Sequence, residues 1–145
     1  MADQVTDFES LQIGDPLGPE HRFVGKQHTR LFVEAAHMDS SRFTDDEAAR
    51  AQGLPAAILP GNMSLSLLTK LLTDWIGAAN ARVVRLGTTY RSPVITEHTV
   101  TLQGFVTHTD SAERTAEIDL WMENEDAERL VIGTATVHFP AGGRK

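Results

Sequence analysis

The stretch "HMDSSRF" (residues 37–43) contains the side chains of this sequence that are best suited to proton transfer. The imidazole of His37 can change its charge near neutral pH, and the carboxylate of Asp39 could set its tautomer, as in a general acid–base pair. Residues two apart do not share a helix face, so the chain would have to turn to bring them together. The alternative interpretation is an exposed helix end, where His37 lies near the negative end of the helix dipole.

A second stretch, "LPGNMS" (59–64), could bind a ligand oxygen. Pro60 and Gly61 precede an amphipathic run, and the first N–H groups of a helix have no partner within the helix. Gly61 lets a ligand approach the backbone closely, and Asn62 and Ser64 follow it. The alternative is a plain helix start that Asn62 or Ser64 caps.

The remaining polar residues form no motif for metal or nucleophilic chemistry. The sequence has no cysteine, and its histidines show neither H-x-H nor H-E-x-x-H spacing, so we expect no metal site. Arg82, Arg85 and Arg91 gather around one segment, where they could hold phosphate groups or simply form a solvated face.

Length and composition indicate an ordinary globular protein. The chain has 145 residues, of which 41% are hydrophobic and 23% are charged, so we expect a single domain over residues 1–145. A formal net charge of -7 argues against a nucleic-acid-binding surface. The sequence contains no 18-residue apolar run and no secretory signal, so we expect no membrane span and a cytoplasmic location.

The elements that must position these residues are helices first and strands afterwards. Apolar spacing and capping signals predict helices over 28–39, 44–53 and 61–78, the second of them N-capped by Thr44 and ended by Gly53. The apolar stripe of the 61–78 helix is wide, which predicts a mostly buried helix.

From residue 83 onward, apolar residues recur at every second position. This period predicts antiparallel strands around residues 100–106, 116–122 and 131–139, with a fourth over 82–91 and a fifth near residue 23. A buried helix followed by long strands predicts an α+β fold in which the sheet wraps around the helix.

This order of elements and three local motifs resemble the MaoC-like hydratases, a hot-dog-fold family that adds or removes water on enoyl thioesters. "FESLQIGD" resembles the family's opening Phe-x-x-Leu-x-Val-Gly-Asp. "TDDEAARAQGLPAAILPGNMS" resembles the stretch that leads into its central helix, and "YRSPV" resembles its later Phe-x-x-Pro-Val. The resemblance implies a curved antiparallel sheet around a central helix at about 61–78, and a dimer with its active site at the interface. It implies no cofactor beyond the coenzyme A thioester itself.

The sequence departs from the family's catalytic motif, Gly-Asp-x-Asn-Pro-x-His. In a gapless match, Met38 stands at the Asp position and Phe43 at the His position, and neither side chain can transfer a proton. A shift by one residue places Asp39 at the Asp position but Thr44 at the His position. We therefore expect Phe43 to contact the substrate without acting on it.

By the same resemblance, Pro60-Gly61-Asn62 corresponds to a His-Gly-Met segment whose amides bind the thioester carbonyl. The leading hypothesis is a dyad-deficient subunit that binds acyl-CoA or acyl-ACP. It would form a homodimer, or a heterodimer in which a MaoC-like paralogue supplies the catalytic pair. The alternatives are a hydratase with a displaced Asp39/His37 pair, a hot-dog thioesterase with Asp39, Asp45 or Glu47 as base, and a non-catalytic acyl-CoA-binding module.

Overall fold

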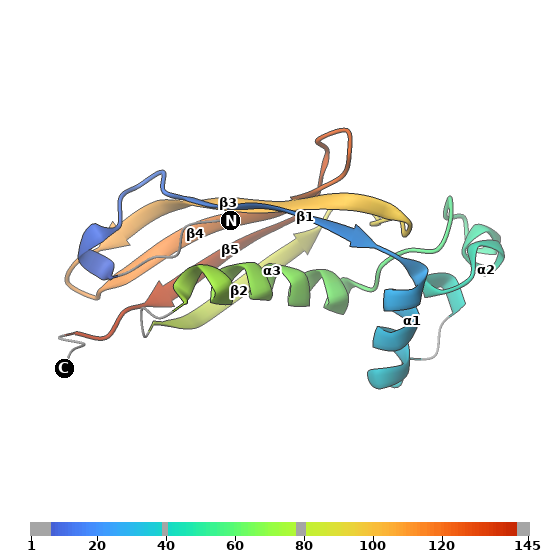
Figure 1. Ribbon diagram of the computed structural model, residues 1–145, viewed down its shortest axis with the longest axis horizontal. Helices are drawn as coiled ribbons and strands as arrows, with labels where there is room; N and C mark the ends of the chain where they lie inside the picture. Colours follow the sequence, from blue (N-terminus) through green and yellow to red (C-terminus); the bar gives the residue numbers. More distant parts are fainter. Residues whose placement is uncertain (1–6, 39–40, 78–80, 142–145) are drawn as a thin grey trace.

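The computed structural model describes residues 7–38, 41–77 and 81–141, which form one five-stranded antiparallel sheet with a long helix lying along it (Figure 1). The strand order is β1-β3-β4-β5-β2, so β1 and β2 are the edges. The strands are β1 (Pro16–Val24), β2 (Arg82–Tyr90), β3 (His98–Asp110), β4 (Thr115–Glu123) and β5 (Arg129–His138). The predicted α+β architecture is confirmed, and β1 starts earlier than the strand expected near residue 23.

Helix α3 (Gly61–Ile76) supplies much of the hydrophobic core. Leu68, Leu71, Leu72, Trp75 and Ile76 are buried, and they pack in one cluster with the inward-facing side chains of the strands. Burying a side chain of this size contributes about 1.5–3 kcal/mol, so the apolar stripe ties the helix firmly to the sheet. The helix ends at Ile76 with Gly77 as its C-cap, and residue 78 of the predicted range lies outside the described residues.

The remaining helices are short. They are η1 (Phe8–Ser10), α1 (Lys26–Ala35), η2 (Ser41–Phe43) and α2 (Asp46–Ala51), and α1 and α2 lie beyond one end of the sheet (Figure 1). Helix α1 therefore begins before the predicted residue 28 and ends before residue 39.

The predicted stop of α2 at Gly53 is confirmed, whereas its predicted N-cap is wrong by one residue. Gly53 has a φ of 89°, and the amide of Leu54 donates to the carbonyl of Ala49, as in a Schellman motif. The N-cap is Asp45, whose carboxylate accepts from the amide of Glu47 at 3.0 Å. The amide of Thr44 is bonded to Ser41, so Thr44 belongs to the preceding turn.

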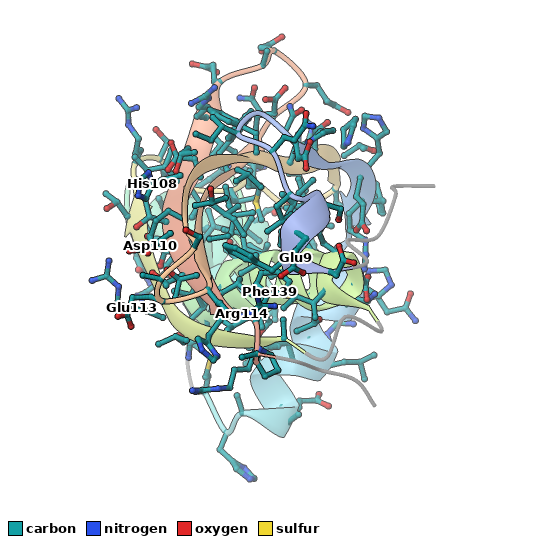
Figure 2. All side chains as sticks on the ribbon, turned by 90° about the vertical axis from the view of Figure 1, so that its left-hand side faces the viewer. Glu9, His108, Asp110, Glu113, Arg114 and Phe139 are labelled. Atoms are coloured by element: carbon teal, nitrogen blue, oxygen red, sulfur yellow. The ribbon has the colours of Figure 1, made fainter. Side chains whose placement is uncertain are left out.

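Both ends of the described chain are fastened to the β3–β4 turn by Arg114 (Figure 2). Its Nη1 donates to Glu9 at 2.6 Å and its Nε donates to the carbonyl of Phe139 at 3.1 Å. The guanidinium also lies 5.1 Å from the ring centroid of Phe8. Its hydrogen bond holds the pKa of Glu9 below the ordinary value. Arg114 thus closes the end of the sheet opposite α1 and α2.

Gly104 of β3 lies where the neighbouring strand β4 leaves no room for a side chain. A Cβ atom there would meet the carbonyl oxygen of Asp119 and lie 2.9 Å from Cδ2 of Leu120. We therefore expect Gly104→Ala to lower the free energy of unfolding by about 1–3 kcal/mol in urea denaturation. Gly87→Ala on β2 is the matched control, because a Cβ atom there meets no atom within 4 Å. Equal losses in the two variants would contradict this account of Gly104.

Candidate functional site

A cavity of about 310 Å³ lies at the N-terminal end of α3. Two segments that are far apart in the sequence, 58–64 and 90–94, meet around it, and they contain the "LPGNMS" and "YRSPV" motifs. The amide of Leu59 donates to the carbonyl of Val94 at 2.8 Å and joins the two segments. The lining consists of Ile58, Leu59, Gly61, Ser64, Tyr90, Arg91, Ser92, Pro93, Val94 and Val131.

Among the side chains that the structure describes, none caps the first turn of α3. Pro60 is the N-cap residue, and its carbonyl accepts from the amides of Met63 and Ser64 at 3.0 and 3.2 Å. The alternative in which Asn62 or Ser64 caps the helix is therefore wrong. Gly61 lines the cavity from an exposed position and Ser64 from a buried one, whereas Pro60 and Asn62 are not among the lining residues. A role in substrate binding stays a prediction for all four.

Tyr90, at the end of β2, holds the start of α3 in place. Its hydroxyl donates to the carbonyl of Gly61 at 3.0 Å. A Cβ atom on Gly61 would lie 3.2 Å from Cζ of Tyr90, so the ring packs where a larger residue would crowd it. In the sequence, Tyr90 stands out only as part of the "YRSPV" motif. The only sign of its role in the sequence is its position directly before Arg-Ser-Pro, where a strand is expected to end.

His37 ends helix α1. It has a φ of 55°, the left-handed conformation that glycine usually takes after a helix, and the amide of Met38 donates to the carbonyl of Val33. The His37 side chain is exposed, which supports the helix-end interpretation. Asp39, the other half of the proposed pair, lies outside the described residues, so the pairing stays a prediction.

Phe43, which stands at the family's His position, is buried in η2 with 6% of its surface exposed. The guanidinium of Arg42 lies 4.8 Å from its ring centroid. Phe43 does not line the 310 Å³ cavity. Packing within the protein is therefore sufficient to explain why its side chain is buried. Contact between Phe43 and a substrate stays a prediction.

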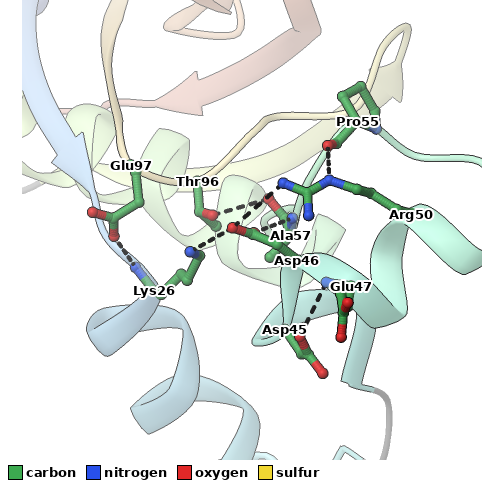
Figure 3. Close-up of polar contacts among 9 residues, drawn as sticks. All are labelled: Lys26, Asp45, Asp46, Glu47, Arg50, Pro55, Ala57, Thr96 and Glu97. Atoms are coloured by element: carbon green, nitrogen blue, oxygen red, sulfur yellow. Dashed lines mark hydrogen bonds and ion pairs between the residues drawn. The ribbon is translucent and has the colours of Figure 1, made fainter.

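Asp46 of α2 holds the segment that leads into α3 (Figure 3). Its Oδ1 accepts from the amide of Ala57 at 2.9 Å, and its Oδ2 accepts from Nζ of Lys26 at 2.8 Å. The carbonyl of Ala57 in turn accepts from the hydroxyl of Thr96 at 2.9 Å. The hydrogen bond from Lys26, together with that from Ala57, lowers the pKa of Asp46. This network connects α1, α2 and the segment before β3.

The long helix held in a five-stranded antiparallel sheet defines a hot-dog fold, and solved structures share it. The (R)-hydratase from A. caviae involved in PHA biosynthesis matches with a TM-score of 0.83 and 19% identity, over 91% of this chain and 99% of that one. The ChsH1-ChsH2 complex from Mycobacterium tuberculosis matches with a TM-score of 0.80 and 19% identity, over 89% and 98%. HadBC, a 3R-hydroxyacyl-ACP dehydratase complex from the same organism, matches with a TM-score of 0.72 and 19% identity, over 88% and 98%.

Residues 11–127 match the family described as FAS1-like, dehydratase domain region. The chain therefore belongs to this family of MaoC-like hot-dog proteins. Among curated proteins, none matches the sequence. Within the described residues, no helix is long and apolar enough to cross a membrane, and no group of His, Asp and Glu side chains could hold a metal ion.

The Asp46 network predicts a pH-dependent contribution to stability. Because the folded protein lowers the pKa of Asp46 from its ordinary value of 3.8, this contribution is present above that pH and is lost as the pH falls through the lowered pKa. We expect Asp46→Asn to lower the Tm at pH 7, and the difference from wild type to shrink below about pH 3.8. Asp126→Asn, an exposed position, is the control. A difference that does not change with pH would contradict the prediction.

The contact between Tyr90 and Gly61 predicts a coupled pair. We expect Gly61→Ala to lower the free energy of unfolding by about 1 kcal/mol, because the new methyl group crowds the Tyr90 ring. In a Tyr90→Ala background the same change should be neutral or stabilising, since alanine is the better helix former. Urea denaturation of both single variants and the double variant gives the coupling energy, and strict additivity would contradict the contact.

Proposed function

We propose that this chain is an acyl-thioester-binding subunit of a MaoC-like hydratase or dehydratase, and that a partner subunit supplies its proton transfers. The proposal rests on the residues that line the 310 Å³ cavity at the N-terminal end of α3. Its lining offers Ser64, Tyr90, Arg91 and Ser92 as polar side chains, and among the described residues it includes no His, Asp or Glu. Such a cavity suits the binding of a polar, uncharged carbonyl group better than acid–base catalysis.

Hydration of an enoyl thioester needs two groups that exchange protons. One base removes a proton from water as the water oxygen bonds to the β-carbon, and one acid protonates the α-carbon. Each such transfer is typically worth about 10²–10⁴-fold in rate. Backbone amides at a helix start can polarise the carbonyl, at about 2.7–4 kcal/mol for each donor in the transition state, but they move no proton.

The heteromeric arrangement has parallels among proteins of this fold. ChsH1-ChsH2 and HadBC are each complexes of two components. By analogy, a MaoC-like paralogue that carries the Asp and His would complete the site in the cytoplasm, with acyl-CoA or acyl-ACP as substrate. A thioesterase base at Asp45 has less support, because that carboxylate caps α2.

The test of catalysis uses the purified full chain and a short trans-2-enoyl-CoA, with loss of the conjugated thioester's absorbance as the readout. We expect no hydration by the chain alone, and turnover once a paralogue with an intact Asp and His motif is added. Turnover by the isolated chain would contradict the proposal. If Asp39→Asn then abolished that turnover, the displaced Asp39/His37 pair would be the better explanation.

The test of binding uses thermal stabilisation by a saturated acyl-CoA. Ligand at one hundred times its Kd stabilises a protein by about 2.7 kcal/mol, which raises the Tm by several degrees. We expect Ser64→Val, which places a methyl group into the cavity, to reduce this rise. Ser66→Val is the matched control, because Ser66 is exposed on the same helix. Equal effects of the two variants would contradict binding in this cavity.

A further inference from the structure

A second cavity, of about 390 Å³, lies on the face of the sheet that points away from α3. Side chains along β4 alternate between the two faces: Leu120 and Met122 belong to the core cluster around α3, whereas Asp119 and Trp121 do not. None of the described residues lines both this cavity and the 310 Å³ cavity. The lining consists of Gly87, Thr88, Thr89, Asp119, Leu120, Trp121, Arg129, Ile132, Gly133 and Thr134.

Arg129 offers this cavity a cation that is held in place by stacking. Its guanidinium lies 3.9 Å from the ring centroid of Trp121. Arg129 stands opposite Glu123 in the strand register, but the carboxylate of Glu123 accepts instead from Nε1 of Trp121 at 2.7 Å and from Gln103 at 3.0 Å. Among the described residues, none forms an ion pair with Arg129. The ring therefore orients the guanidinium and leaves its N–H groups available to an anion.

Asp119 brings the opposite charge to the same cavity. It lies two positions before Trp121 on the same face of β4, which is about 7 Å along the strand. Its carboxylate forms no ion pair within the part of the chain that the structure describes. The guanidinium of Arg129 lies over Trp121 and is therefore beyond the reach of about 4 Å at which it would pair with Asp119. One cavity thus contains two separate, opposite charges.

A ligand with a single charge suits this cavity poorly. A carboxylate bound to Arg129 would be repelled by Asp119, and an ammonium bound to Asp119 would be repelled by Arg129. Neither repulsion is screened away, because about 7 Å is less than the Debye length of about 10 Å at 0.1 M salt. A ligand that carries both charges turns both repulsions into attractions.

An α-amino acid has the dimensions that this pair of charges requires. Its ammonium nitrogen and carboxylate carbon are about 2.5 Å apart, and a charge-assisted hydrogen bond of about 2.8 Å at each end fills the gap between Asp119 and Arg129. The carboxylate also matches the guanidinium, because both groups are planar and can form two parallel hydrogen bonds.

The space beside the charges suits an aliphatic group. Gly87 leaves the cavity open, since a Cβ atom there would meet no atom within 4 Å. It stands opposite Thr134 in the register, and Thr89 stands opposite Ile132. The Ile132 side chain and the methyl groups of the two threonines give this part of the cavity an apolar surface.

We propose that this cavity binds a free α-amino acid with an aliphatic side chain. The carboxylate of the amino acid binds Arg129, its ammonium binds Asp119, and its side chain lies beside Gly87 and Ile132. This site is separate from the thioester site of the proposed function and does not depend on it.

The test is a titration of the isotope-labelled full chain with L-leucine, followed by NMR. The chain has two tryptophans and therefore two indole N–H signals. The signal of Trp121 and the amide signal of Gly87 should shift in a saturable way, whereas the signal of Trp75 in the core should not. Leucinamide, which keeps only the ammonium, and N-acetylleucine, which keeps only the carboxylate, should each bind at least about tenfold more weakly.

Two variants test the charges separately. Asp119→Asn leaves Arg129 alone, so N-acetylleucine should bind this variant at least as tightly as leucine does. Arg129→Gln leaves Asp119 alone, so leucinamide should bind at least as tightly as leucine. Misfolding cannot produce these opposite changes of preference. Asp126→Asn and Arg85→Gln are the matched controls, because both residues are exposed and neither lines this cavity, and they should keep the preference of the wild type.

Three results would overturn the inference. The first is the absence of any shift of the Trp121 signal with leucine. The second is equal affinity for leucine and its two derivatives, or an unchanged preference in both variants. The third is a shift of the same signals by coenzyme A but not by leucine, which would assign Arg129 to phosphate binding.

Discussion

The burial of α3 against the curved sheet is the constraint on which the rest of the molecule depends. Leu68, Leu71, Leu72, Trp75 and Ile76 pack against the inward-facing side chains of the strands, and this fixes both the axis and the rotation of the helix. Once the helix is fixed, its first turn must lie at one end of the sheet. The position of the cavity, which Gly61 and Tyr90 both line, is therefore a consequence of core packing.

The two ends of the sheet are organised by different interactions. At one end, Arg114 joins Glu9, Phe8 and Phe139 in a compact contact between the ends of the described chain. At the other end, Asp46 joins elements from three parts of the chain through hydrogen bonds to Lys26 and Ala57. The first arrangement closes one end of the sheet, whereas the second holds the segment that leads into α3.

Much of the fold could be predicted from the sequence because hydrophobic periodicity reflects burial directly. The wide stripe of 61–78 and the alternation after residue 83 indicated the central helix and its sheet. Local chemistry was harder to predict. Thr44 and Asp45 are both good capping residues, and only the structure shows that the carboxylate of Asp45 accepts from the amide of Glu47. The contact between Tyr90 and Gly61 joins residues 29 apart, and no local pattern indicates a contact at that distance.

Tyr90 belongs to the exposed edge strand and at the same time fixes the first residue of α3. Because of this one hydrogen bond, a displacement of the end of β2 would also displace the start of the helix. Tyr90 therefore links the edge of the sheet to the wall of the cavity.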